Sequence, residues 1–311
     1  MPDDPKINAA NLPAIRDHSR LWRQNRYVYP VVSRRAYGVS IGVNVNPSKA
    51  CTFNCVYCQV NRRVKGPAEP VDLGVLIREL NEMLEWAASG DIWSDPHFAE
   101  VPSELRRIHD IAFSGDGEPT VHRNFADLVQ IAADVRRHHR LDRAWLVVIS
   151  NASRFHTQSF RRTVPILRAN NGIVWAKLDA GSAALFNRIN RTTTSFKRIL
   201  ENIEWLTREM AVIIQTCLFR LDGTGPDDTE IELYIARLRR MLDLGGWIAG
   251  VQLYSIARSP AESNVAWLPD AELTTIATRI RDALPELNVE VYGGADVPPQ
   301  ESGGTTREQR N

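Results

Sequence analysis

Apolar runs of strand length alternate with segments of helical periodicity along most of this chain. The expected strands show little polar alternation, which is typical of strands buried on both faces of a sheet. They lie at 39–45, 110–114, 144–150, 173–178, 211–218 and 251–256, with one more short strand expected at 288–292. The expected helices lie between them, at 71–88, 124–138, 159–170, 195–209, 228–242 and 270–284. This alternation predicts a parallel sheet covered by helices.

The number of strand–helix units narrows the fold further. About six units are expected, and a closed barrel of this type needs eight. We therefore expect an α/β fold, a partial (β/α)6 TIM-like barrel with a parallel sheet, and the alternative is a doubly wound open sheet. In both folds ligands bind at the carboxyl ends of the strands. Ser195 is expected to cap the helix that follows it.

Three segments are expected in the chain. Residues 1–30 form an N-terminal extension, in which 11–26 has the spacing of a short amphipathic helix. Residues 31–297 form the barrel domain. Residues 298–311 form a tail rich in Gly, Ser, Thr and Gln, and this composition predicts disorder.

Charge and cysteine content limit the environment of the protein. The 311 residues carry a formal net charge of +1, which gives no overall attraction to nucleic acid or to an anionic membrane. The N-terminus lacks the apolar core of a signal peptide, and no apolar run approaches the length that spans a membrane. Only four cysteines are present, and three of them are clustered. We therefore expect a protein of the reducing cytoplasm.

The clustered cysteines, Cys51, Cys55 and Cys58, have the spacing C-x3-C-x2-C. Three thiolates at such short spacing are typical of an iron–sulfur cluster, and on a 4Fe-4S cluster they leave one iron open to a reactant. A structural zinc site is the first alternative, but such sites use four protein ligands and no histidine lies nearby. Ordinary buried thiols or a disulfide are the second alternative.

Polar residues follow several of the expected strands. Gly115, Asp116, Gly117 and Glu118 follow the second strand, Asn151 closes the third, Asp179 follows the fourth and Tyr254 lies on the sixth. If the strands are parallel, these groups meet the cysteines at one edge of the sheet and line a pocket. The glycines allow a ligand to approach the backbone, and Glu118 adds a carboxylate that suits an ammonium group. A plain turn, or an Asp that caps one, is the alternative.

With these residues in place, the chain resembles the radical S-adenosylmethionine (radical SAM) superfamily. The three cysteines match its C-x3-C-x-φ-C signature, with Tyr57 at the aromatic position. Gly115 to Glu118 is similar to its glycine–glycine–glutamate motif, although Asp116 stands where many members carry Gly or Ser. Further segments resemble a subgroup of Fe–S oxidoreductases related to the tRNA wyosine-synthesis enzymes: 33–35, 42–44, 58–59, 113–120 and 177–181.

The resemblance implies two cofactors and a place for each. Cys51, Cys55 and Cys58 would hold a 4Fe-4S cluster, and the open iron would bind the amino and carboxylate groups of S-adenosylmethionine (SAM). The resemblance also implies which residues contact each part of SAM. The methionyl ammonium would contact Gly115, Asp116, Gly117 and Glu118. The carboxylate and the ribose would contact Asn151 and Asp179, and the adenine would lie beside Tyr57 and Tyr254.

The resemblance also implies a reaction. One electron from the reduced cluster would cleave SAM and give a 5′-deoxyadenosyl radical, which abstracts hydrogen from a substrate that the sequence does not identify. Because only Cys217 remains after residue 58, we expect no second cluster and an external electron donor of the flavodoxin or ferredoxin type. One alternative is a tRNA-modifying member of the same class. The other is a non-catalytic scaffold that binds a metal or a cluster.

Overall fold

One curled sheet organises the molecule. The structure, a computed structural model, describes residues 20, 22–33, 38–256, 260 and 262–293. In these residues eight strands form a sheet in the order β1-β2-β3-β4-β5-β6-β8-β10. These strands are β1 (Val28–Ser33), β2 (Gly38–Val43), β3 (Ile108–Phe113), β4 (Trp145–Ser150), β5 (Gly172–Lys177), β6 (Val212–Cys217), β8 (Ile248–Tyr254) and β10 (Val289–Tyr292). A separate pair joins β7 (Phe219–Leu221) to β9 (Val265–Trp267).

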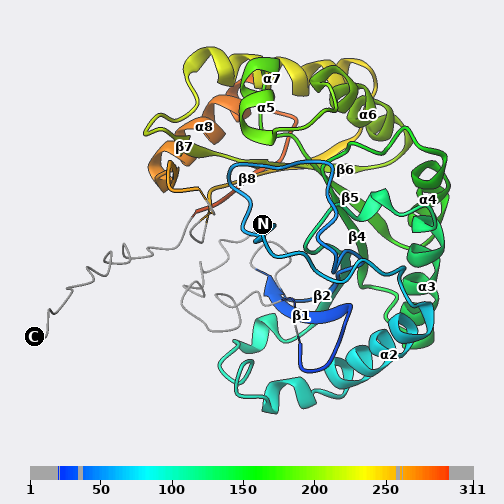
Figure 1. The fold of residues 1–311 in the computed structure, drawn as a ribbon. Helices are drawn as coiled ribbons and strands as arrows, with labels where there is room; N and C mark the ends of the chain where they lie inside the picture. The colour runs from blue at the N-terminus through cyan, green and yellow to red at the C-terminus, as the bar shows by residue number, and fades with distance from the viewer. Residues whose placement is uncertain (1–19, 21, 34–37, 257–259, 261, 294–311) are drawn as a thin grey trace, which may run out of the picture.

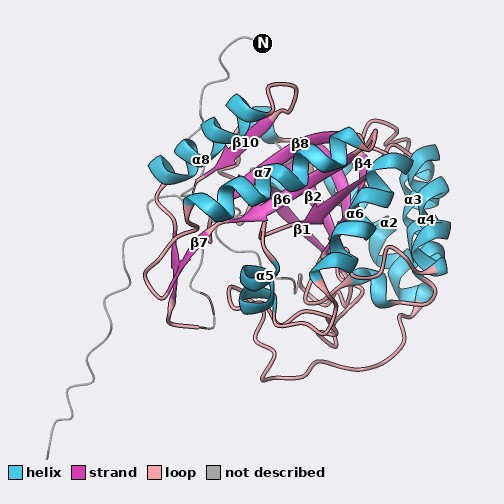
Figure 2. Cartoon of the chain, turned by 90° about the horizontal axis from the view of Figure 1, so that it is seen from above, coloured by secondary structure: helices cyan, strands magenta, loops and turns pink. Residues whose placement is uncertain are grey.

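Apart from α5, which lies beyond the ends of the strands, the helices lie on the outer side of this sheet (Figure 1 and Figure 2). They are α2 (Leu73–Ser89), α3 (Phe125–His138), α4 (Gln158–Ala169), α5 (Ala183–Asn190), α6 (Phe196–Glu209), α7 (Asp228–Asp243) and α8 (Asp270–Ala283). Short 3-10 turns occur at Asp91–Ser94, Ser103–Leu105 and Pro119–Val121. None of the helices in the described residues is long and apolar enough to cross a membrane.

Strand direction confirms the partial barrel. Each neighbouring pair from β2 to β10 is parallel, and each of the six strands before β10 leads through one or two helices to the next parallel strand. The doubly wound alternative is wrong, because the helices that cover the sheet lie on its outer face (Figure 2). The strand β1 runs antiparallel to β2 at one edge, with Val28 opposite Val43.

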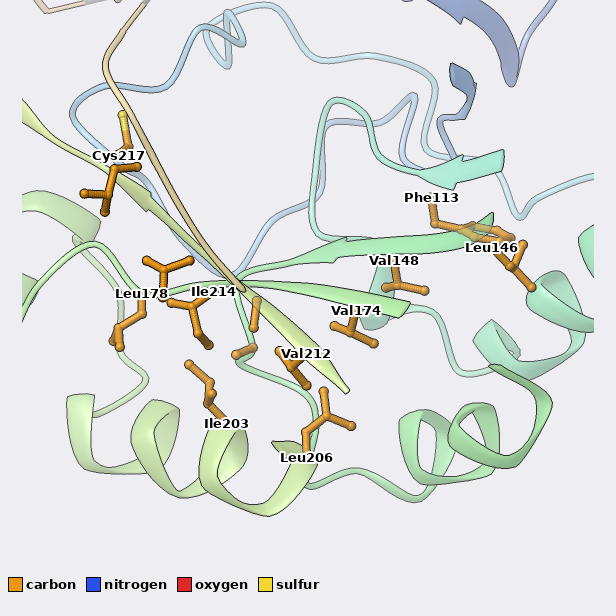
Figure 3. Close-up of a cluster of buried hydrophobic side chains, with 14 of the residues drawn as sticks. Phe113, Leu146, Val148, Val174, Leu178, Ile203, Leu206, Val212, Ile214 and Cys217 are labelled. Carbon is orange, nitrogen blue, oxygen red and sulfur yellow. The ribbon is translucent and has the colours of Figure 1, made fainter. Parts of the chain in front are cut away.

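The two faces of the central strands pack differently. Val148, Val174 and Val212 are buried against the helices, where Ile203 and Leu206 of α6 point toward the sheet (Figure 3). The alternate residues face the other side and form a second, small apolar cluster of Ala112, Val147, Ile173 and Trp175. Both faces of β3, β4 and β5 therefore bury apolar residues, as the near absence of polar alternation predicted. The inner face also buries two hydrogen-bonded polar pairs, Ser40 with Asp110 and Gln215 with Gln252.

Some predictions about the ends of the fold are wrong, and others stay predictions. Most of the predicted helix 11–26 lies outside the described residues, and its last residues, 22–26, form a turn rather than a helix. The prediction also missed β1, α5 and the β7–β9 pair. The proposed boundary between residues 30 and 31 stays a prediction, although β1 begins at Val28. The predicted tail, 298–311, lies outside the described residues.

Candidate functional site

The loop that carries the cysteines follows β2 and is held from two sides. The amide of Glu118, in the loop after β3, donates to the carbonyl of Ala50 at 3.0 Å. The amide of Asn54 donates to the carbonyl of Asn190 at the end of α5, also at 3.0 Å. The last carbonyls of a helix have no partner within the helix, so a neighbouring chain segment is well placed to satisfy them. The cysteine loop is thus fixed between the loop after β3 and α5.

Each cysteine sulfur lies within hydrogen-bonding distance of one side-chain N–H group. The three donors come from different parts of the chain: the end of α5, the residue after β4 and the cysteine loop itself. The contacts are Asn151 Nδ2 to Cys51 Sγ at 3.7 Å, Asn190 Nδ2 to Cys55 Sγ at 3.3 Å and Arg62 Nη2 to Cys58 Sγ at 3.7 Å. Such donors stabilise negative charge on sulfur and orient it.

The thiols are free and half-buried, so the disulfide considered from the sequence is wrong. Burial raises the pKa of Cys51, and the nearby Glu118 carboxylate raises it further. Burial also raises the pKa of Cys55, to about 12, against the opposing effect of the Asn190 hydrogen bond. Because iron binds the thiolate form, loading this site with metal must release protons.

The donor set fits an iron–sulfur cluster. In the described part of the chain, no three Cys, His, Asp or Glu side chains lie close enough to hold one metal ion. The thiolates of a 4Fe-4S cluster bind different iron atoms, so they need not converge on a single point. The guanidinium beside Cys58 also carries a spare donor, because Arg62 Nε is buried and has no hydrogen-bond partner among the described residues. Cluster sulfides accept such hydrogen bonds.

The glycine loop after β3 packs directly on the cysteine loop. A Cβ on Gly117 would lie 2.0 Å from the Ala50 carbonyl oxygen, and one on Gly115 would lie 2.3 Å from Asn44 Oδ1. Both positions therefore need glycine for close approach rather than for an unusual φ. Between them, the Asp116 carboxylate accepts hydrogen bonds from Arg20 at 2.6 Å and from Asn44 at 2.8 Å.

Glu118 lies beneath this loop rather than at its surface. Only 2% of the residue is exposed. Its carboxylate accepts four hydrogen bonds, from the Thr120 amide at 3.2 Å, Thr120 Oγ1 at 2.5 Å, Ser150 Oγ at 2.7 Å and the Asn151 amide at 2.8 Å. Burial raises the pKa of Glu118, and these donors oppose that effect. Glu118 thus ties the loop after β3 to the end of β4, where Asn151 begins its contact with Cys51.

A second polar group lies on the other side of the cysteine loop. Tyr57 donates a short hydrogen bond to Asp179 Oδ2, and the amide of Cys217 donates to Asp179 Oδ1 at 2.8 Å. Lys177 Nζ lies 3.6 Å from Asp179 Oδ1 and donates to the Tyr254 hydroxyl. The same ammonium lies 5.1 Å from the ring centres of Tyr57 and Tyr254, within the range of a cation–π contact.

Electrostatics fix the protonation of this group. Burial raises the pKa of Tyr57, and the Asp179 charge raises it further, so the phenol keeps its proton. Burial lowers the pKa of Lys177, but Asp179 and the Tyr254 hydroxyl more than offset this, and the net pKa lies above the ordinary value. Lys177 is therefore a fixed cation, paired with Asp179 inside the site rather than on the surface.

The structure brings most of the predicted residues to the same edge of the sheet. Asn151 contacts the cysteine loop, Asp179 contacts Tyr57 within that loop, and Glu118 joins two of the strand ends. Cys217 is buried and 2% exposed, as expected of a core residue. The sequence analysis missed Asn190 and Arg62. No periodicity or motif singles out either residue, because each depends on where the folded chain places it.

Comparison with known proteins places the chain in a family. The family model "Radical SAM superfamily" matches residues 45–238, a range that includes the three cysteines. A protein named UPF0026 protein MJ1312, from Methanocaldococcus jannaschii, is 28% identical over 162 residues, which cover 52% of this chain and 43% of the relative. The chain spans less than half the length of the first curated relatives that it matches.

Two solved structures have a similar fold. A radical SAM methyltransferase from Sphaerobacter thermophilus gives a TM-score of 0.58 at 13% identity, covering 87% of this chain and 70% of that one. A structure of TYW1 with a lysine-pyruvate adduct bound gives a TM-score of 0.52 at 18% identity, covering 79% and 74%. At these identities the likeness concerns the fold alone. The family model, however, covers more than half of the chain, and this protein therefore belongs to the radical SAM superfamily.

Proposed function

We propose that this protein is an enzyme that reductively cleaves SAM at a 4Fe-4S cluster held by Cys51, Cys55 and Cys58. When bound, the reduced cluster supplies one electron to the sulfonium of SAM, which gives methionine and a 5′-deoxyadenosyl radical that abstracts hydrogen from a substrate. The observation that carries the proposal is the set of three free, half-buried thiols in one loop, each with its own N–H donor. Membership of the superfamily supports the same reaction.

The protein's own residues would position SAM beside the open corner of the cluster. Residues 114–117 are half-buried, and we assign their backbone to the methionyl ammonium. The four donors around the Glu118 carboxylate support a structural share in this role, since this carboxylate holds the loop from below. Asn151 is assigned to the methionyl carboxylate, because its amide already lies at the cysteine loop, 2.9 Å from Thr52 Oγ1.

The group around Asp179 would hold the nucleoside. Asp179 is a hydrogen-bond acceptor for ribose hydroxyls, and the rings of Tyr57 and Tyr254 are suited to the adenine. Lys177 balances the Asp179 charge, which keeps a buried carboxylate stable before a ligand arrives.

Anaerobic incubation with SAM and a strong reductant tests the proposal. The wild type should form 5′-deoxyadenosine, and Cys55→Ala should not, because it removes one of the three ligands. Cys217→Ala is the matched control: it removes a buried thiol outside the loop and should keep both the iron and the product. Equal product from wild type and Cys55→Ala would refute the assignment. A folded wild type that binds a cluster or another metal but not SAM after anaerobic reconstitution would favour the non-catalytic scaffold.

Two partners belong to the proposal. We infer an external electron donor of the flavodoxin or ferredoxin type, because the loop that would hold the cluster is half-buried and Cys217 is the only cysteine outside that loop. A clear excess over four irons per chain would contradict the single cluster.

A cytoplasmic location agrees with free cysteines and an oxygen-sensitive cofactor. For the tRNA-modifying alternative, a salt-sensitive mobility shift with tRNA is the distinguishing measurement.

A further inference from the structure

The sulfur of Cys58 has a donor of a different kind from the other two. Cys51 and Cys55 face neutral amides, whereas Cys58 lies 3.7 Å from a guanidinium nitrogen of Arg62. A cation close to a thiolate in a partly buried site stabilises negative charge more strongly than a neutral amide does. Arg62 keeps this charge at any pH at which the protein is folded.

Arg62 is held in this position by a reciprocal clamp with Lys49. Arg62 Nη1 donates to the carbonyl of Lys49 at 2.7 Å. In return, Lys49 Nζ donates to the carbonyls of Asn61 at 2.8 Å and Val64 at 2.7 Å, on either side of Arg62. Lys49 itself has a left-handed backbone, with φ of 63°. A side chain held by this many contacts occupies a defined place, unlike the neighbouring exposed Arg63.

The clamp leaves one donor of the guanidinium unused. Arg62 Nε is buried and lacks a hydrogen-bond partner among the described residues. A buried N–H group without a partner normally carries a free-energy penalty. An acceptor in the cysteine loop, where a cluster brings both thiolates and sulfides, would remove it. The position of Arg62 is thus suited to a group that is more negative than three neutral thiols.

We propose that Arg62 is a positioning residue that favours the reduced state of the cluster and so sets the potential at which the external donor can reduce it. The inference rests on the proposed function. Reduction adds one electron and no proton to the cluster, and the extra charge spreads onto its sulfurs. The fixed guanidinium stabilises the reduced state more than the oxidised state, which raises the midpoint potential. The Asn151 and Asn190 amides stabilise both states with a smaller preference.

The test compares midpoint potentials of reconstituted variants by redox titration monitored by electron paramagnetic resonance. Arg62→Gln keeps a donor but removes the charge, Arg62→Lys keeps the charge, and Arg63→Gln removes the exposed neighbouring charge as the matched control. At a fixed solution potential, Arg62→Gln should lower the ratio of reduced to oxidised cluster by about tenfold, which corresponds to a midpoint about 59 mV more negative for one electron. Arg62→Lys and Arg63→Gln should stay near the wild type.

A midpoint of Arg62→Gln equal to that of Arg63→Gln overturns the inference. If Arg62→Gln takes up no iron, Lys49→Met replaces it, since this variant loosens the clamp and keeps the guanidinium. Its midpoint should then shift in the same direction, and an unchanged midpoint overturns the inference. Failure of the proposed function is separate: it would appear in the wild type, as a missing cluster signal or as absent 5′-deoxyadenosine, before any variant is compared.

Discussion

Replacing Glu118 with glutamine tests whether this residue supports the site from within the protein. The side chain is nearly fully buried, and its two oxygens accept four hydrogen bonds. Glutamine has almost the same shape but exchanges one acceptor oxygen for an NH2 donor. Oε1 accepts three of the bonds and Oε2 accepts the fourth, from the Asn151 amide at 2.8 Å. The amide group of Glu118→Gln should therefore keep its oxygen at the Oε1 position and face the Asn151 N–H with its nitrogen.

Two opposing effects determine how much Glu118→Gln changes the free energy of unfolding. Loss of a hydrogen bond to a charged acceptor costs about 1.5–3 kcal/mol, and in Glu118→Gln the side-chain NH2 group also faces the Asn151 N–H, which is another donor. The hydroxyls of Thr120 and Ser150 can rotate, but the Asn151 N–H belongs to the backbone and cannot. Removal of a buried charge recovers part of this cost, because burial raises the pKa of Glu118. The hydrogen-bond term is larger, since the four donors are arranged for an anion, and the net loss should be about 1–3 kcal/mol.

Urea unfolding of the protein without its cluster measures this change apart from any effect on the cofactor. Glu118→Gln should lower the midpoint with an unchanged slope. Glu232→Gln is the control, because Glu232 is exposed on α7, and its free energy of unfolding should change by less than about 0.5 kcal/mol. Equal midpoints for the two variants would show that the Glu118 hydrogen bonds contribute nothing net, and the reasoning would then fail.

Two further variants probe the parts of the site that flank the cysteine loop. Gly117→Ala places a Cβ 2.0 Å from the Ala50 carbonyl oxygen, where about 3.0 Å is needed. It should therefore lower the free energy of unfolding by about 1–3 kcal/mol and reduce the iron retained after reconstitution. Gly74→Ala in α2 is the control: its Cβ would lie 3.4 Å from the nearest atom, Asp72 Oδ1, so it should be neutral or stabilising in the same measurements. Lys177→Met leaves the buried Asp179 carboxylate without its cation and should lower the free energy of unfolding by about 3 kcal/mol in the same urea assay, whereas an unchanged midpoint would mean that the pair adds no stability.

The sequence predicted the parallel strands and their helices because both carry strong local signals. An apolar run bounded by polar residues marks each central strand, and a capping residue marks several helix starts. Ser195 is one example: its hydroxyl accepts from the Arg198 amide at 3.2 Å, as the prediction required. Boundaries differ from the prediction by a few residues at most, since the ends of elements depend on hydrogen bonds that a pattern does not specify.

The missed elements are those with weak local signals. Pro30 lies inside β1, and proline argues against a central strand but is tolerated at the edge of a sheet, where β1 lies. Helix α5 spans only Ala183–Asn190, and a helix this short shows little periodicity. The strands β7 and β9 have three residues each and are defined by their pairing with each other. Tertiary contacts, rather than propensity, decide whether such segments form.

The same distinction applies to the site. The cysteines and the glycine loop were predictable because the functional residues of each lie close together in the sequence. Asn190 was not, because it reaches Cys55 only after α5 has packed against the cysteine loop, 135 positions away in sequence. Arg62 lies close to Cys58 in sequence, yet its role depends on the clamp with Lys49, which only the folded loop reveals.

The distribution of hydrogen bonds separates residues that support the site from residues that a ligand can reach. Glu118 has its carboxylate enclosed by four donors from the protein, whereas residues 114–117 just before it are half-buried. A ligand that used Glu118 would have to displace one of these donors, and the backbone amides of Thr120 and Asn151 cannot rotate away. The lower-cost arrangement keeps Glu118 as the internal tie and presents the backbone of the glycine loop to the ligand. Glycine at positions 115 and 117 is then required twice, by the tight packing below the loop and by the approach of a ligand above it.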